Sequence, residues 1–170
     1  AVTKFTNELY AEIFKKLYDL KILGLRYFNI FGGRQSPNGP YAAVIPKWIL
    51  AILNQEKVEI NGDGTTSRDF CYIDNAIQAN LLAAFTDKKS ALGQVFNIAL
   101  NHETNLDDLY KMIVNNIRLK KSNLKIYDPI YKDFRLGDVK HSRADISKAK
   151  NLLGYSPTHK VEEGIDETVS

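Results

Sequence analysis

The stretch that decides the fold is Leu23 to Phe31, which reads LGLRYFNIF. This run is almost continuously apolar, as is typical of a strand that is buried on both faces of a sheet. The pair Gly32-Gly33 ends the run, and functional residues often lie just beyond the end of such a strand. Helices and strands are predicted to alternate on either side of it, which indicates an α/β architecture.

The segment before this strand is predicted to be a helix over residues 2–20 with an unusually broad apolar face. Its apolar residues recur at helical spacing, and three aromatic residues widen the stripe. They are Val2, Phe5, Leu9, Ile13, Leu17 and Leu20, with Tyr10, Phe14 and Tyr18. No Ser, Thr, Asp or Asn precedes the pattern as a cap, so we expect the sequence to open inside a helix that starts upstream.

The segments after the strand alternate in the same way. The pattern predicts helices at 42–53, 75–85 with Asp74 as its N-cap, 106–117 with a capping box of Thr104 and Asp107, Asp145 to Gly154, and 161–169. It also predicts a strand at 94–99 and a hairpin-like element of residues 58–61 and 68–73 around the turn 62–64. No Gly-rich phosphate loop follows any predicted strand, so a self-sufficient dinucleotide-binding fold is not expected.

Composition excludes several classes of protein. The 170 residues are 44% hydrophobic and 25% charged, which is ordinary for a globular domain. With 23 basic and 20 acidic residues the net charge is +3, too balanced to suggest nucleic-acid binding, which has only the pI of 8.8 in its favour. The single cysteine, Cys71, lies in an apolar run and is expected in the core, as in a cytoplasmic protein. We expect neither a signal peptide nor a membrane span.

Four polar arrangements interrupt these patterns, and each has a simpler alternative. Lys4 near the start of the first helix is by itself typical of a solvated surface residue. Asn29 at the strand end needs hydrogen-bond partners or forms a turn. The planar guanidinium of Arg68 suits bidentate binding of a diphosphate, although a local ion pair with Asp69 or Asp63 would also account for an arginine at this position. Residues 135–138 (RLGD) place a second arginine beside a carboxylate in a segment that otherwise reads as a solvated loop.

The order and spacing of these arrangements resemble the extended short-chain dehydrogenase/reductase family, and within it the NAD-dependent nucleotide-sugar epimerases. Residues 1–4 (AVTK) are similar to the end of the Tyr-x-x-x-Lys motif, whose tyrosine would precede Ala1. Residues 26–32 (RYFNIFG), 61–74 (NGDGTTSRDFCYID), 135–138 (RLGD) and 144–149 (ADISKA) are similar to four later motifs of that family. The resemblance covers essentially the whole chain and is strongest to UDP-N-acetylglucosamine/UDP-N-acetylgalactosamine 4-epimerases, in their C-terminal half.

The resemblance implies a catalytic role for Lys4 and a site for a UDP-sugar. Lys4 would bind the nicotinamide ribose of NAD and favour the ionised tyrosine by its charge, with Tyr27 and Phe28 along the cofactor. The substrate-binding residues that it implies are Asn29, Ala43, Val44, Trp48, Asn61, Arg68, Arg135 and Asp138. Of these, Arg68 and Arg135 would hold the phosphates and Asp138 the uridine ribose. No metal is implied.

The resemblance also implies a sugar preference, a partner and a domain division. Ser142 occupies a position that is small in family members accepting N-acetyl sugars, which favours interconversion of UDP-GlcNAc and UDP-GalNAc. The helix at 2–20 would form a homodimer interface. Residues 1–32 would end the Rossmann-like domain, and residues 33–170 would form mainly the small α/β substrate-binding domain, with segments that return to the Rossmann core.

The chain is expected neither to retain NAD nor to turn over alone, because the NAD loop and the catalytic tyrosine would lie upstream. Three alternatives to a 4-epimerase stay open at this point. A dehydratase, decarboxylase or reductase of the same family would share the UDP-binding residues. A non-catalytic UDP-sugar-binding fragment and a structural or nucleic-acid-binding protein are the other two.

Overall fold

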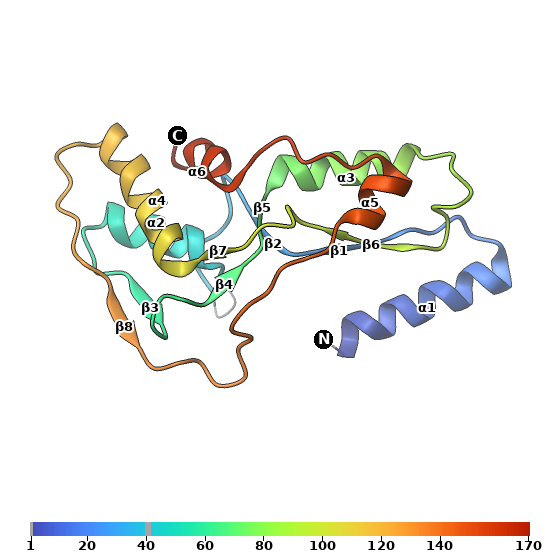
Figure 1. Ribbon diagram of the computed structural model, residues 1–170, viewed down its shortest axis with the longest axis horizontal. Coiled ribbons are helices and arrows are strands. Elements are labelled where there is room, and N and C mark those ends of the chain that lie inside the picture. The colour runs from blue at the N-terminus through green and yellow to red at the C-terminus, as the bar shows by residue number, and fades with distance from the viewer. Residues whose placement is uncertain (1, 40–41) are drawn as a thin grey trace.

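The computed structural model describes residues 2–39 and 42–170, and these form an α/β arrangement of helices around short strands (Figure 1). The helices are α1 (Val2–Tyr18), α2 (Val44–Leu53), α3 (Ile73–Phe85), α4 (Leu106–Lys120), α5 (Ser147–Leu153) and α6 (Val161–Val169). The strands are β1 (Gly24–Tyr27), β2 (Asn29–Phe31), β3 (Glu59–Asn61), β4 (Ser67–Arg68), β5 (Phe70–Tyr72), β6 (Val95–Ile98), β7 (Thr104–Asn105) and β8 (Ile130–Lys132). The predicted α/β class is confirmed.

The run that was expected to be one strand is divided at Phe28. Before the break, β1 pairs in parallel with β6, and after it, β2 pairs in parallel with β5. At the break the Phe28 amide donates to Ile98 O (3.1 Å), and the next amide, that of Asn29, donates to Asp69 O (3.3 Å). The prediction of a strand buried on both faces is also wrong, because Tyr27 is 49% exposed. The chain therefore exchanges one strand partner for another where the cofactor and substrate residues were expected.

The predicted hairpin between residues 58–61 and 68–73 does not form. β3 pairs in parallel with β8, β4 pairs antiparallel with β7, and β5 pairs with β2. Between β3 and β4, Gly62 and Gly64 both have positive φ (85° and 81°), a conformation that only glycine adopts without strain. After these two glycines, β4 and β5 do not return to β3, and each strand pairs with a distant part of the sequence.

The helix ends differ from prediction mainly in which residue makes the cap. Asp74 lies in the first turn of α3, whose N-cap is Tyr72. The N-cap of α4 is Asn105, whose side chain accepts from the Asp108 amide (2.7 Å), so the predicted capping box of Thr104 and Asp107 is wrong. Asp145 does accept from the first amide of α5, that of Ser147 (2.8 Å). Gly154 ends α5 at φ 75°, as predicted.

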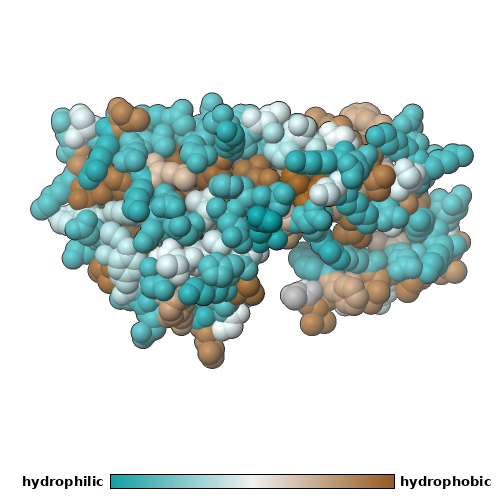
Figure 2. Space-filling view, in the orientation of Figure 1, coloured by the Kyte–Doolittle hydropathy of each residue, from teal (hydrophilic) through white to brown (hydrophobic). Residues whose placement is uncertain are grey.

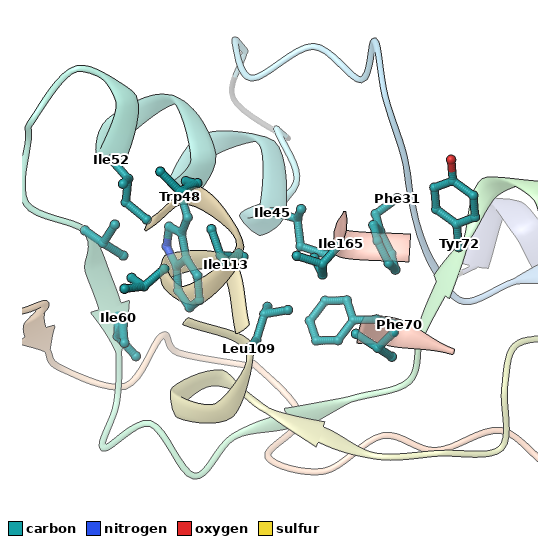
Figure 3. Packing of buried hydrophobic residues seen from close by; sticks show 14 residues of the cluster. Phe31, Ile45, Trp48, Ile52, Ile60, Phe70, Tyr72, Leu109, Ile113 and Ile165 are labelled. Carbon is teal, nitrogen blue, oxygen red and sulfur yellow. The ribbon is translucent and has the colours of Figure 1, made fainter. Parts of the chain in front are cut away.

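Two buried clusters hold the described residues together. The first lies between α2, α4 and α6 on one side and the strands β2, β3 and β5 on the other (Figure 3). Figure 3 shows Trp48 reaching from α2 between Ile60 and Ile113, where its indole N–H donates to Glu59 O (3.2 Å). The second packs α3 and α5 against β1 and β6. The cleft described below lies against the first of these clusters.

Cys71 is fully buried between the two clusters, as predicted. Burial raises the pKa of its thiol to about 11. A thiol that stays protonated near neutral pH is a poor nucleophile, so Cys71 acts as a small apolar core residue.

Helix α1 lies apart from both clusters, below β1 and β6 in Figure 1. None of its side chains is buried among the described residues. Its apolar stripe is exposed, from Val2 (79%) to Leu17 (69%), and Figure 2 shows brown side chains along its outer edge. The broad apolar face predicted from the sequence is therefore present on the surface of the described chain.

Candidate functional site

A cleft of about 590 Å³ opens beside α2, in the size range of small-molecule sites. Eight of the nine substrate-binding residues predicted from the sequence line it, and they come from five separate segments of the chain. They are Asn29, Ala43, Val44, Trp48, Asn61, Arg68, Arg135 and Asp138. The ninth, Ser142, is not among the lining residues. The fold thus gathers positions that are up to about a hundred residues apart in the sequence into one concave surface.

Arg68 and Asp138 form the charged centre of this cleft. The guanidinium forms a salt bridge with Asp138 Oδ1, and one of its terminal nitrogens donates to Ser67 O (2.7 Å) and Lys140 O (3.3 Å). These bonds leave the Nε–H and one N–H of Nη2 without an acceptor among the described residues, so two donors remain for an anionic ligand. The local ion pair with Asp69 or Asp63, considered from the sequence, is not the pairing observed.

A tight turn brings Asp138 to Arg68. The Asp138 amide donates to Arg135 O (3.1 Å), and Gly137 lies between them at φ 79°. A positive φ at the third residue is what such a turn requires, so glycine at this position has a structural reason. The turn places Arg135 and Asp138 on the same side of the cleft, although the sequence pattern of this segment was aperiodic.

The Gly-Asp-Gly loop after β3 packs against the residue that precedes this turn. A Cβ atom at Gly62 would collide with the ring of Phe134, the residue before Arg135. The absence of a side chain at Gly62 therefore lets Phe134 pack onto the loop and anchors the segment that carries Arg135. Asp63 stabilises the loop by accepting from the amide and hydroxyl of Thr65 (3.0 and 2.6 Å), and these bonds lower its pKa.

The N-terminus of α2 forms the apolar wall of the cleft. Ala43 is its N-cap residue and makes no side-chain cap, so the first-turn amides have no side-chain acceptor from this position. Trp48, one turn further along, is only 5% exposed and presents an edge to the cleft while its ring fills the core. A helix N-terminus beside an indole edge suits a flat polar ring next to phosphate groups.

The three residues predicted to bind the cofactor do not lie in this cleft. Lys4 and Tyr27 line a second cavity of about 780 Å³ between α1 and β1. The Tyr27 hydroxyl donates to Asn80 Oδ1 on α3 (2.9 Å), whereas its neighbour Arg26 bonds to α1, so the two side chains leave β1 on opposite faces. Phe28 packs against the second core cluster. Only Lys4 and Tyr27 are thus brought to one cavity.

Ser142 lies behind the charged centre. Its amide donates to Ser67 O (3.2 Å), one residue from Arg68, and the preceding residue, His141, shares a hydrogen bond with the Ser67 hydroxyl (2.9 Å). The segment of Ser142 is therefore tied to the strand that carries Arg68, although Ser142 does not line the cleft.

Comparison with known proteins shows the family of this chain. A family model described as the NAD dependent epimerase/dehydratase family matches residues 1–99, more than half of the chain. The chain belongs to this family of epimerases and dehydratases. The predicted resemblance to extended short-chain dehydrogenases/reductases and the Rossmann-like fold is thereby confirmed.

Individual members of the epimerase family match nearly the whole chain. A UDP-N-acetylglucosamine 4-epimerase from Methanobrevibacter ruminantium M1, in complex with UDP-N-acetylmuramic acid, is 44% identical with a TM-score of 0.84, over 95% of this chain and 49% of that one. A UDP-glucose 4-epimerase from Thermotoga maritima, with UDP-glucose, is 38% identical with a TM-score of 0.87, over 99% of this chain and 51% of that one. A UDP-glucose 4-epimerase from Mycolicibacterium smegmatis is 31% identical over 169 residues, which are 99% of this chain and 51% of that protein. The chain spans about half the length of these relatives.

The site residues predicted from the sequence of this epimerase-family chain did not include Asp69, a buried neighbour of Arg68 that does not itself line the cleft. It is fully buried, its two carboxylate oxygens accept from the amides of Leu100 (2.9 Å) and Ala144 (3.1 Å), and its own carbonyl accepts from Asn29 N. Burial raises the pKa of this carboxyl, and the backbone amides oppose the shift. A carboxylate inside the apolar run at residues 68–73 was the signal, because a buried charge must find partners.

Gly62→Ala is expected to weaken both the fold and the cleft of this epimerase-family protein. The φ of 85° strains alanine, and the new methyl group would collide with Phe134 and displace Arg135. We expect a loss of about 2 kcal/mol or more in unfolding free energy, measured by urea denaturation, together with weaker UDP binding.

Gly154→Ala is the matched control, because Gly154 has φ 75° and open space where the new methyl group would lie. It should cost about 1 kcal/mol from backbone strain and leave UDP binding unchanged. Equal losses of unfolding free energy and of UDP affinity in the two variants would contradict the role given to the Phe134 contact.

The described residues offer neither a metal site nor a membrane-spanning helix. Within residues 2–39 and 42–170, no group of three or more His, Cys, Asp or Glu side chains is placed to hold a metal ion. The helices of the described chain are all too short or too polar to cross a membrane.

Proposed function

We propose that this chain is the C-terminal half of an NAD-dependent UDP-sugar 4-epimerase that interconverts UDP-GlcNAc and UDP-GalNAc. The observation that carries the proposal is the convergence of Arg68, Arg135 and Asp138 on one cleft with an apolar wall. Two arginines beside a carboxylate suit a diphosphate next to a ribose, because guanidinium groups bind phosphate oxygens in pairs and carboxylates accept from hydroxyls. The 44% identity to a UDP-N-acetylglucosamine 4-epimerase supports the choice of sugar.

In this proposal the residues of the cleft hold the UDP moiety and leave the sugar free to turn. Arg68 binds the phosphates through the two donors that its contacts to Asp138, Ser67 and Lys140 leave open. Asp138 accepts from the ribose, and the α2 N-terminus with Asn61 holds the uracil. Because binding energy is concentrated on UDP, the hexose can present either face of C4 to the reacting groups.

The residues of this chain fit one end of an NAD cofactor. Lys4 and Tyr27 line the cavity that runs between α1 and β1. Tyr27 is the last residue of β1, and open α/β folds bind their ligands at the carboxyl ends of their strands. When bound, NAD would accept and return the C4 hydride of the sugar. Lys4 would hold the nicotinamide ribose, and its positive charge would favour the ionised form of the catalytic tyrosine. We expect the 170-residue chain alone to bind UDP without turnover, because in this proposal the NAD phosphate loop would belong to the other half of the enzyme.

The exposed stripe of α1 supports a homodimer through this helix. Large apolar side chains follow one face from Val2 to Leu17, and a contiguous surface of this kind is rarely left in contact with water. In the proposed enzyme a second copy covers it, as the family resemblance implies.

The test is to assay the full-length enzyme with UDP-GlcNAc and UDP-glucose and to separate the products by chromatography. Formation of UDP-GalNAc from UDP-GlcNAc, without net oxidation of the sugar, supports the proposal. Efficient epimerisation of UDP-glucose with none of UDP-GlcNAc would refute the proposed substrate. Loss of carbon dioxide or water from the sugar would indicate a decarboxylase or dehydratase of the same family.

Ser142→Tyr is expected to change which sugars the full-length enzyme accepts. The family resemblance carries this prediction. Ser142 is tied through Ser67 to the strand of Arg68 but does not line the cleft, so a bulky side chain would act by reaching from this position toward the bound sugar. We expect kcat/KM for UDP-GlcNAc to fall at least about tenfold, with UDP-glucose much less affected. Ser122→Tyr, on the exposed turn after α4, is the control. Equal losses for both sugars would contradict a role for position 142 in selecting the N-acetyl group.

A further inference from the structure

Helix α1 is attached to the rest of the described chain by few polar contacts, although it carries Lys4. The helix buries none of its side chains. Near its N-terminal end, Glu8 receives two hydrogen bonds from Arg26 of β1, from Nε (2.7 Å) and from Nη2 (2.6 Å). Near its C-terminal end, Lys15 Nζ donates to Leu92 O (3.2 Å). Within the described chain, two side-chain ties therefore connect α1 to the rest of the fold.

The Glu8–Arg26 tie is the one that bears on the site. Glu8 follows Lys4 by four residues, so the two side chains lie one above the other on the same face of α1. Arg26 immediately precedes Tyr27, which lines the same cavity as Lys4. Figure 1 shows α1 running antiparallel to β1, so the end of the helix that carries Lys4 lies below the end of the strand that carries Tyr27.

The geometry of this pair is directional. A carboxylate that receives two parallel N–H groups from one guanidinium is held in orientation as well as in distance, unlike a pair with a single contact. The Glu8 side chain is 23% exposed, and the bonds from Arg26 lower its pKa, so it stays ionised. By contrast, Glu12 one turn later pairs with Lys16 of the same helix (2.6 Å), which cannot position α1 against the strand.

We propose that Glu8 and Arg26 are positioning residues that set the register of α1 on β1 and thereby hold the Lys4 ammonium in the cavity between these two elements. The inference rests on the proposed function for its effect on turnover. The pair itself touches neither substrate nor the reacting atoms. Its removal should alter the chemical step and leave UDP binding intact, because the residues that hold UDP belong to other elements.

The test compares Glu8→Gln with Glu12→Gln in the full-length enzyme. For Glu8→Gln we expect kcat to fall about ten- to hundredfold, because a displacement of about an ångström at a catalytic group has effects of this size. KM for the UDP-sugar should stay within about twofold of wild type. Because a displaced Lys4 favours the ionised tyrosine less, the acid limb of the kcat profile should also move to higher pH. Glu12→Gln should match wild type in all three measurements.

A charge exchange makes the test independent of a general loss of stability. Glu8→Arg alone and Arg26→Glu alone should each lower kcat, and the two changes together should recover at least about a third of the loss on a logarithmic scale. No recovery in the double variant, or a kcat of Glu8→Gln equal to that of Glu12→Gln, would overturn the inference. A rise in KM parallel to the fall in kcat would do the same.

Hydrogen exchange separates a failure of this inference from a failure of the proposed function. Amides of α1 should exchange at least about threefold faster in Glu8→Gln than in Glu12→Gln if the tie holds the helix. If the wild-type enzyme turns over no UDP-sugar, the proposed function fails, and this exchange comparison still decides whether the tie exists. Unchanged exchange in Glu8→Gln would overturn the inference directly.

Discussion

Arg68→Ala is expected to weaken UDP binding by the 170-residue chain about a hundredfold. Arg68 lines the cleft with two donors that have no acceptor among the described residues, and loss of charge-assisted bonds to a diphosphate costs about 3 kcal/mol. The change also leaves the Asp138 carboxylate in the cleft without its arginine, which adds repulsion toward phosphate. Isothermal titration calorimetry with UDP measures the effect.

Two controls show whether the loss comes from the geometry of Arg68 or from charge alone. Arg68→Lys keeps the positive charge but not the planar fork, and it should recover only part of the affinity. Arg118→Ala removes one positive charge from α4, away from the residues that line the cleft, and should bind UDP like the wild type. Wild-type affinity of Arg68→Ala would place the UDP site elsewhere.

Asp69→Ala is expected to destabilise the protein by about 3 kcal/mol. The change leaves the amides of Leu100 and Ala144 buried without their acceptors, and each such amide costs about 1–3 kcal/mol, less the gain from no longer burying a charge. Asp69→Asn keeps one acceptor and should lose less. Asp63→Ala, which removes bonds to Thr65 only, should lose least. Urea denaturation measures the three variants.

The pH dependence of this loss has a definite sign. Burial raises the pKa of Asp69, so the folded protein holds this proton more tightly than the unfolded chain. The stability that this group contributes is therefore largest below the ordinary carboxyl pKa and falls as the pH rises through the raised pKa. The difference between wild type and Asp69→Ala should shrink over that window. A difference that grows with pH would contradict a raised pKa.

The predicted elements were most accurate where the signal is local. The sequence pattern predicted the helices α1, α4 and α6 and the end of α5 at Gly154, because a helix makes its hydrogen bonds within four residues. The cap of α4 was misassigned by one residue, since Thr104 and Asn105 both suit a cap and only the backbone at β7 decides between them.

Strand pairing could not be read in the same way. The hairpin predicted around Gly62 looked plausible because turn residues separated two apolar runs. In the structure β3 pairs with β8, about seventy residues later, and β8 is so short and exposed that it carries no periodic signal. A strand's partner is chosen by the packing of the whole chain, which the local pattern does not encode.

For this protein the sequence alone determined the α/β class, the family and eight of the residues that line the cleft. The α/β class follows from local periodicity, whereas the family and these residues follow from the resemblance of short motifs to known epimerases. Only the tertiary structure decided that Arg68 pairs with Asp138 instead of its neighbour Asp69, that Asp69 holds two distant amides, and that Glu8 ties α1 to Arg26. The physical reason is that charged groups choose partners by proximity in space after burial, and the turn at Gly137 and the break at Phe28 set that proximity across long separations in sequence.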